Sequence, residues 1–455
     1  MKDLTQGSVL KHLVQMASFL AVSMAAQTLY LLADLYWVGR LGKEAIAAVG
    51  VAGNLTMIVL AVTQMLGVGT TTLIAQAAGR KDQPQAELIL NQSLVLSLAV
   101  ALGLGVLGFF IRVPYANSLS ADRATAALAH SYLVWFIPAL VLQFPLVALG
   151  SALRATGIVK PAVALQVLSV FLNIVLAPLL VFGLVGLPRL GVTGAALATF
   201  ISILIADVLM VFYFLKKYDY LRFRRKLWRP QFATWWAMLR IGLPAGAEFA
   251  VLFLFIVIVY GIIRDFGPAA QAGFGVGARV MQSLFLPVVA LSFAIGPIVG
   301  QNFGGRHADR VRQSVKVAIG LAAAIMLVLA VLTHFLAGSL LRPFSNDPRV
   351  IAFGSEYLRI AAFNFVAAGI VFSSSSVFQG LGHTIPPLLS SLLRVLLFAL
   401  PALWLSRQPG FALRYLWYLS VASQLLQAGI NLLLLRRELH RKLVFPALTP
   451  GAATT

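Results

Sequence analysis

Long runs of apolar residues, separated by short polar segments, make up most of this 455-residue chain. A helix needs about 20 apolar residues to cross the ~30 Å hydrocarbon layer of a membrane. A membrane β-barrel would instead give alternating segments of about ten residues, and the sequence has none. The pattern predicts an all-α integral membrane protein with twelve transmembrane helices, at about 13–38, 46–78, 88–111, 128–153, 161–183, 191–215, 238–263, 270–302, 313–337, 356–382, 385–406 and 414–435.

Composition narrows the class of protein. Only 11% of the residues are charged and 60% are apolar, whereas soluble domains carry about 25% charged residues. These values exclude a soluble enzyme, a disordered protein and a nucleic-acid binder. The chain has no cysteine, so it has no disulfide and no thiolate ligand for a metal. We expect no cofactor and no metal site.

The basic residues give a net charge of +21 and lie in short clusters between the apolar runs. If the N-terminus is inside the cell, the inner segments hold 22 Lys and Arg residues and the outer segments hold 10. This bias predicts that both termini are cytoplasmic, in a multi-pass protein of a bacterial or archaeal plasma membrane. The basic run from Lys216 to Lys226 is expected to be a mid-chain loop, solvated or in contact with lipid headgroups.

The two halves of the chain align at a constant offset of 225 residues. Gly42 matches Gly267, and Gln76-x-x-Gly79 matches Gln301-x-x-Gly304. Each half has six predicted helices, and because six is an even number both halves begin on the same membrane face. This predicts a parallel repeat about an axis along the membrane normal. We therefore expect two six-helix bundles facing a central cavity, with domains at 1–215 (N-terminal bundle), 216–237 (basic linker), 238–437 (C-terminal bundle) and 438–455 (tail).

Such repeats are typical of secondary transporters that work by alternating access. The sequence has no GxxxxGK[ST] loop for ATP and no TVGYG-like potassium filter. Transport is thus expected to draw on an ion gradient, which requires titratable or coordinating groups within the membrane.

Three acids lie well inside predicted spans, and each is a functional candidate because an unpaired acid in a membrane is costly. Asp34 lies about one turn from the end of the first span, and Tyr30, four residues earlier, shares its helix face. A low-dielectric environment favours the neutral form of a carboxylate, so Asp34 is the candidate proton carrier. The alternative is that Asp34 caps the next loop or pairs with Arg40.

The other two acids have stronger structural alternatives. Glu248 follows Pro244 by four residues, near mid-membrane, where a proline-bent helix commonly lines a cavity. Its alternative role is a structural ion pair with Arg279, Arg359 or Arg394. For Asp207 we expect a structural pair or a polar contact between helices. Asn173 and Thr199 could hydrogen-bond a carboxylate across the bundle, although such residues commonly serve as contacts between helices.

These features together resemble the multidrug and toxic compound extrusion (MATE) transporters, over nearly the whole chain. The resemblance is carried by Asp34 through Gly39-Arg40-Leu41-Gly42, Gly69, Gln76-Ala-Ala-Gly79, Gly191-Val-Thr-Gly194, Gly296-Pro297-x-x-Gly300-Gln301-Asn302-Phe303-Gly304, Gln379-Gly380-x-Gly382 and Pro386. It implies export of hydrophobic, often cationic compounds in exchange for protons or sodium ions. In the DinF-like branch an aspartate of the first helix is central to proton coupling, and Asp34 matches it. Tyr30, Asn173 and Thr199 match polar positions around that aspartate.

The sequence also departs from the family pattern. Where the DinF-like branch commonly has an acid in helix 5, this chain has Ala177, and its first helix lacks the usual proline. The NorM-like branch uses acids of the C-terminal bundle, which Glu248 resembles only loosely. The DinF-like branch is the better match.

The prediction is a monomeric antiporter in the lipid bilayer that exports amphipathic cations against inward proton flow. Asp34 is the expected coupling acid, and Tyr30, Asn173, Thr199 and Glu248 are expected to line the cation or substrate pocket. Sodium coupling and a flippase for lipid-linked oligosaccharides remain alternatives. A membrane-embedded enzyme is disfavoured, because His334 is the only histidine placed within a span and has no partner motif.

Overall fold

The computed structural model describes residues 1–445, and this part of the chain is helical with no strand. The α-helices are α1 (Val9–Gly39), α2 (Lys43–Gly79), α3 (Gln83–Leu119), α4 (Arg123–Ala155), α5 (Lys160–Phe182), α6 (Val192–Lys216), α7 (Phe232–Ile263), α8 (Pro268–Gly304), α9 (Ala308–Leu341), α10 (Pro348–Ala361), α11 (Asn364–Gly380), α12 (Ile385–Leu405) and α13 (Leu413–Lys442). Three short 3₁₀ turns lie between them: η1 (Leu184–Gly186), η2 (Arg225–Trp228) and η3 (Arg264–Phe266).

Eleven of the described helices are long and apolar enough to cross a membrane, and the bent pair α10–α11 brings the number to twelve. The count of twelve is confirmed, but the single helix expected at 356–382 is wrong. The chain bends there by 57° between Ala361 and Asn364. A ring nitrogen of His334 lies 3.1 Å from the carbonyl oxygen of Arg359, and such a side-chain insertion into a helix ladder accompanies kinks.

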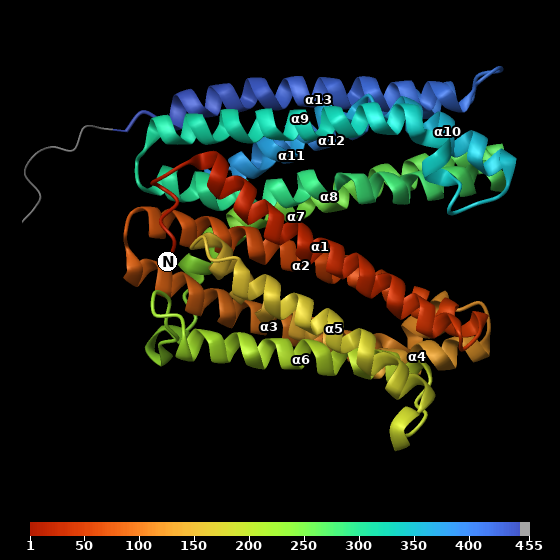
Figure 1. Cartoon of the computed structure of the whole chain (residues 1–455), viewed down its shortest axis with the longest axis horizontal. Helices are drawn as coiled ribbons and strands as arrows, with labels where there is room; N and C mark the ends of the chain where they lie inside the picture. The colour runs from red at the N-terminus through yellow and green to blue at the C-terminus, as the bar shows by residue number, and fades with distance from the viewer. Residues whose placement is uncertain (446–455) are drawn as a thin grey trace, which may run out of the picture.

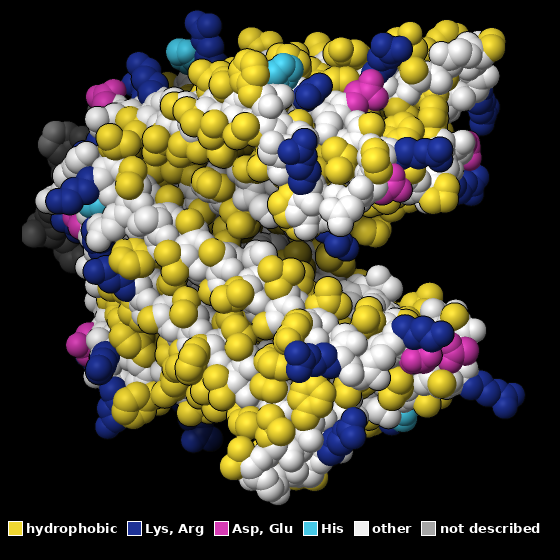
Figure 2. Space-filling model, turned by 45° about the vertical axis from the view of Figure 1, so that its right-hand side comes forward, with side chains coloured by type: hydrophobic (Ala, Val, Ile, Leu, Met, Phe, Trp, Pro, Cys, Tyr) yellow, Lys and Arg dark blue, Asp and Glu magenta, His cyan; other side chains and the backbone are white. Residues whose placement is uncertain are grey.

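The membrane-facing surface is covered with large apolar side chains (Figure 2). Phe110 and Phe335 are 77% and 76% exposed, on α3 and α9 respectively. An exposed apolar surface of this extent is what a bilayer covers, and it is not found on soluble monomers.

Two helical bundles form a V (Figure 1): α2–α6 make the N-terminal bundle and α8–α13 the C-terminal bundle. We call the end where the bundles meet the closed face; α1 and α7 begin there, and α2 and α8 end there. The opposite end is the open face, where the space-filling view shows a deep notch between the bundles (Figure 2). Residue 1 and residue 445 both lie at the closed face.

The first helix of each repeat crosses from one bundle to the other. α1 begins with Leu13 and Met16 packed into the core of α8, and it ends in the N-terminal bundle, where Trp37 contacts Phe182 of α5. α7 also begins at the closed face but crosses to the other bundle: it starts against α2 and ends in the core of the C-terminal bundle. The start of α7 lies so close to α2 that a Cβ atom at Gly242 would overlap the carbonyl oxygen of Met65.

The basic linker between α6 and α7 is hydrogen-bonded to α3 through its backbone, while the lysine and arginine side chains of the run 216–226 are exposed, as expected of a loop that faces water or lipid headgroups. The Asn91 amide nitrogen donates to the carbonyl oxygen of Arg222 at 3.0 Å, and its oxygen accepts from the Arg224 backbone at 3.0 Å and the Trp228 indole at 2.9 Å. Gln92 donates to the carbonyl oxygens of residues 227 and 229, at 2.6 and 2.7 Å. α7 begins at Phe232, so residues 232–237 are helical and only 217–231 connect the two bundles.

Repeat-related glutamines join the bundles at the closed face. Gln76 Nε2 on α2 donates to the carbonyl oxygen of Gly380 at 2.9 Å. Gln301 Nε2 on α8 donates to the carbonyl oxygen of Ala155 at 2.8 Å. Donors and acceptors are both related by the 225-residue offset, so the pair marks the pseudo-twofold axis. We call these two hydrogen bonds the glutamine lock.

Candidate functional site

The N-terminal bundle holds Asp34 on α1, with only 5% of its surface exposed. One turn earlier, the Tyr30 hydroxyl lies 3.1 Å from the Thr199 hydroxyl of α6. Asn173 Nδ2 of α5 donates to the same hydroxyl at 3.0 Å. The structure thus brings Tyr30, Asn173 and Thr199 into one hydrogen-bonded group beside Asp34.

Asp34 itself is poorly satisfied. Its Oδ1 atom and the Oδ1 atom of Asn173 are buried and have no hydrogen-bond partner in residues 1–445. The alternative pairing with Arg40 is not formed, because the Arg40 guanidinium lies against Tyr36, donating to its hydroxyl at 2.5 Å. A buried carboxylate without a cation is costly in a membrane, and residues 1–445 provide no ion pair for Asp34.

Asp207 on α6 differs from expectation. Its side chain is buried, 7% exposed, and neither carboxylate oxygen has a hydrogen-bond partner in the described chain. The expected structural pair and the expected polar contact between helices are therefore both wrong. The nearest lysine in sequence, Lys216, lies at the end of α6, more than two turns away, which is too far along the helix to reach the carboxylate.

Glu248 on α7 lies in the C-terminal bundle, apart from the other predicted site residues. Its Oε1 atom accepts from the Ser375 hydroxyl of α11 at 3.1 Å and from the Ser391 hydroxyl of α12 at 3.5 Å. Gln427 Nε2 of α13 donates to Ser391 at 2.9 Å. Three other helices thus meet the carboxylate through neutral polar groups, α11 and α12 directly and α13 through Ser391.

The proposed ionic partners of Glu248 do not reach it. Within residues 1–445, no ion pair joins Glu248 to Arg279, Arg359 or Arg394. Arg394 instead lies over the ring of Phe255, 4.6 Å from its centroid. The structure therefore has one polar cluster in each bundle, around Asp34 and around Glu248, in place of a single shared pocket.

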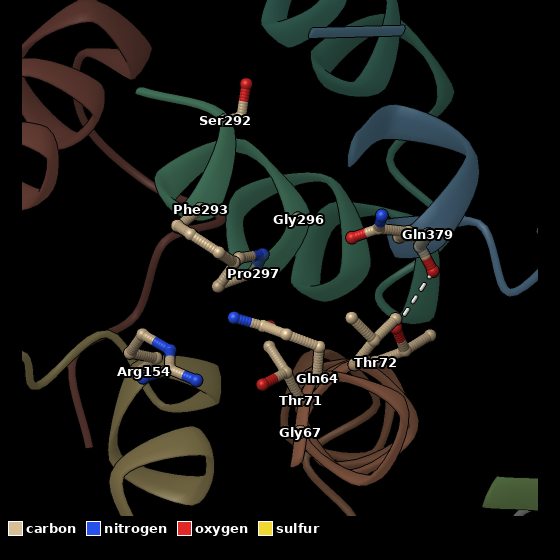
Figure 3. Close-up of a pocket in the computed structure, with 11 residues that line it drawn as sticks. Gln64, Gly67, Thr71, Thr72, Arg154, Ser292, Phe293, Gly296, Pro297 and Gln379 are labelled. Atoms are coloured by element: carbon tan, nitrogen blue, oxygen red, sulfur yellow. Dashed lines mark hydrogen bonds between the residues drawn. The ribbon is translucent and has the colours of Figure 1, made fainter. Parts of the chain in front are cut away.

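A third polar region lies between the bundles, next to the glutamine lock on its open-face side. This axial pocket is lined by α2, α4, α8 and α11 (Figure 3). Ten of its lining residues form five pairs related by the 225-residue offset, which are Gly67 and Ser292, Val68 and Phe293, Thr71 and Gly296, Thr72 and Pro297, and Arg154 and Gln379. The pocket therefore lies on the pseudo-twofold axis.

Sequence reasoning missed this pocket. The sequence pattern did not single out Arg154, and it indicated Gln379 only as part of a motif. The repeat offset carried the necessary signal, because it places a polar side chain at the same position of both halves. In Figure 3 Arg154 and Gln64 point into the space between α2 and α4, and the Thr72 hydroxyl donates to the carbonyl oxygen of Gln379 at 2.9 Å.

The polar clusters do not form a site for a transition metal. Within residues 1–445, no three side chains of His, Cys, Asp or Glu lie close enough together to hold a metal ion. The chemistry available here is proton exchange at buried carboxylates, coordination of a hard cation by oxygen atoms, and binding of an organic molecule between the bundles.

Comparison with known proteins identifies the family. The family model described as MatE matches residues 20–179 and 244–405, which lie in the two repeats. A probable multidrug resistance protein of Bacillus subtilis, YpnP, is 29% identical, with 91% of this chain and 90% of that protein covered. An FAD transporter of Shewanella oneidensis is 28% identical, with 81% and 82% covered.

Solved structures agree in fold. A transporter of the MOP superfamily from Pyrococcus furiosus, described as having a binding pocket of reverse polarity, aligns with a TM-score of 0.89 at 25% identity, covering 97% of this chain and 98% of that one. An outward-facing multidrug resistance MATE transporter aligns with a TM-score of 0.89 at 24% identity and the same coverage. The match of the family model over both repeats establishes that the chain belongs to the MatE family of multidrug and toxic compound extrusion transporters, and that it is a multi-pass membrane transporter, not an enzyme.

Proposed function

We propose that this protein exports amphipathic, often cationic compounds in exchange for protons, by alternating access of the cleft between its bundles. The observation that carries the proposal is Asp34, a buried carboxylate with an oxygen that has no partner in the described chain. Relatives named as multidrug resistance proteins support the export of drug-like molecules.

Exchange requires that proton and substrate compete. Ionised Asp34 attracts a cation in a low-dielectric site, and protonation removes that attraction. Loss of the charge also changes the balance of hydrogen bonds around Tyr30 and Thr199, which join α1 to α6. The arrival of a proton from the open face would therefore release the substrate and let α1 repack.

We further propose that the closed face is cytoplasmic, since the basic linker and both ends of the described chain lie there, and that this conformation is outward-facing. The moving units would be the N-terminal and C-terminal bundles, joined by the linker at 217–231. Of the proposed tail at 438–455, residues 438–442 belong to α13, and residues 446–455 lie outside the described part of the chain. The working unit is proposed to be a monomer in the plasma membrane.

The test is efflux of rhodamine 123 from proteoliposomes under a proton gradient or a sodium gradient, applied separately. Asp34→Asn is expected to abolish proton-driven efflux, whereas Asp207→Asn, a change of the same kind in the same bundle, is expected to retain it. Efflux by Asp34→Asn at the wild-type rate would overturn the proposal, and loss in Asp207→Asn alone would move the coupling acid to α6.

Sodium coupling is the second candidate, and the Glu248 cluster favours it. The carboxylate and two serine hydroxyls supply oxygen atoms, which are the ligands that hard cations prefer. The Gln427 amide oxygen is also buried and has no hydrogen-bond partner in the described chain. Sodium-driven efflux that is lost in Glu248→Gln would place coupling in the C-terminal bundle. If neither gradient drives efflux, scrambling of a labelled lipid-linked oligosaccharide would test the flippase alternative.

A further inference from the structure

The axial pocket contains a cation with no acid to balance it. Arg154, at the end of α4, lines the pocket, and none of the other lining residues is acidic. Its one side-chain hydrogen bond in the described chain is with the Ser151 hydroxyl, at 2.7 Å. A guanidinium has five N–H donors, so most of its donor capacity is free to bind a ligand.

The guanidinium is oriented by Ser151 of its own helix and lies next to α2. It lies across Gly67 of α2, where an added Cβ atom would be 4.0 Å from the Arg154 Nη2 atom and 3.0 Å from the Ser151 hydroxyl. Figure 3 shows Arg154 directed toward the side chains of Gln64 and Thr71. A second polar group is unpaired as well, because the Ser292 hydroxyl is buried and has no partner within residues 1–445.

The remaining wall of the pocket is apolar. Phe293 and Pro297 of α8 lie opposite Arg154 (Figure 3), and Val68 of α2 also lines the pocket. The pocket thus presents one cation, a few neutral hydrogen-bonding groups and an apolar surface. A planar guanidinium binds carboxylate and phosphate groups through two parallel hydrogen bonds. A simple organic cation placed here would gain nothing from Arg154 and would be repelled by it.

We propose that the axial pocket binds an anionic group of the transported molecule, a carboxylate or a phosphate, with Arg154 as its main ligand. This inference rests on the proposed transport function and adds a substrate class to it: amphipathic molecules that carry an acidic group, zwitterions included. The acidic group would lie on the pseudo-twofold axis, one helical turn from the glutamine lock, and the apolar part would extend along Phe293 toward the cleft.

The repeat supplies a conservative variant. The residue equivalent to Arg154 in the second half is Gln379, so Arg154→Gln gives both halves the same polar side chain without a charge. Arg154→Lys keeps the charge and removes the planar fork. Arg394→Gln is the matched control, because Arg394 is a cation within the C-terminal bundle that does not line the axial pocket.

The first readout is equilibrium binding to purified protein, measured by fluorescence, with three probes: carboxyfluorescein for a carboxylate, flavin mononucleotide for a phosphate and rhodamine 123 for a cation. We expect Arg154→Gln to raise the Kd of at least one anionic probe tenfold or more relative to that of rhodamine 123, which corresponds to about 1.4 kcal/mol. Arg154→Lys is expected to recover part of this preference, and Arg394→Gln to leave the ratio within twofold of wild type.

The anionic probe whose Kd rises in Arg154→Gln shows whether the pocket prefers a carboxylate or a phosphate. The inference is overturned if wild type binds neither anionic probe, or if Arg154→Gln weakens all three probes equally, since that would indicate a structural role. Failure of the proposed function gives a different result. In that case no probe moves under either gradient in proteoliposomes, whereas the charge preference in binding is still measurable.

Discussion

The two hydrogen bonds of the glutamine lock stabilise the closed face, and substitutions can measure the contribution of each bond to the free energy of the closed conformation. Gln76 donates to Gly380 across the interface, and Gln301 donates to Ala155. Gln301 also accepts, through Oε1, a hydrogen bond of 2.9 Å from the backbone of Leu4. The N-terminal segment that holds Leu4 is in turn bonded to α4, so this extra bond also links the two bundles.

A net contribution of about 1 kcal/mol per hydrogen bond gives the expected magnitudes. Methionine is close to glutamine in size but does not form these bonds. Gln76→Met loses one bond, so the ratio of closed to open conformations is expected to fall about fivefold. Gln301→Met loses two, so the ratio is expected to fall about thirtyfold. Two residues equivalent in the repeat are therefore expected to differ in effect.

The assay is the distance between spin labels on the closed face, measured by double electron–electron resonance. The chain has no cysteine, so Arg80→Cys with Asp309→Cys gives one labelled pair across the interface. Gln85→Met, on the peripheral helix α3 at the same face, is the control and is expected to leave the distances unchanged. Equal shifts for Gln76→Met and Gln301→Met, or no shift for either, would refute this account of the lock.

Three further changes test other parts of the fold. A Cβ atom at Gly79 would overlap the carbonyl oxygen of Gln301. Gly79→Ala is therefore expected to increase the distance between the spin labels on the closed face. Gly50→Ala is the control and is expected to leave that distance unchanged, because no atom lies within 4 Å of a Cβ atom at Gly50. Asn91→Ala removes three hydrogen bonds to the linker; trypsin is expected to cleave there at least tenfold faster than in wild type, and an unchanged rate would contradict the role assigned to Asn91. Hydrogen bonds from the Thr125 backbone and hydroxyl lower the pKa of Asp122, at the start of α4. The ionised form of Asp122 therefore stabilises the fold above about pH 4, and this stabilisation is lost as the pH falls through the lowered pKa. The difference in melting temperature between wild type and Asp122→Ala is expected to vanish in acid. A difference that stays constant with pH would contradict this role of Asp122.

Much of the fold follows from hydropathy and the repeat, because a bilayer admits few alternatives to long apolar helices. The break between α10 and α11 could not be predicted, because no proline lies at the bend and the contact comes from His334, on another helix. The binding of the linker to α3 was missed for a similar reason. Asn91 and Gln92 lie more than 130 residues before the backbone atoms that they bind, and no periodicity encodes such a contact.

The residues of the candidate site that could be predicted are those whose position inside an apolar span is visible in the sequence. A buried acid such as Asp34 is conspicuous in a chain with 14 acidic residues, and Tyr30 follows from helical spacing. The absence of a partner for Asp207 was not predictable, since pairing depends on how helices are rotated against each other. Arg154 was overlooked because it lies near the end of a span, where a basic residue usually serves orientation.

The crossing of α1 and α7 has an evolutionary and an engineering consequence. Each repeat places its first helix against the other repeat, in the manner of two subunits that exchange arms. An ancestral half-length protein with this arrangement would have been an obligate dimer, because a lone half would leave the docking surface of the missing arm uncovered. For the same reason the present chain, cut within 217–231 and produced as two fragments, should reassemble inside the membrane from its own complementary halves.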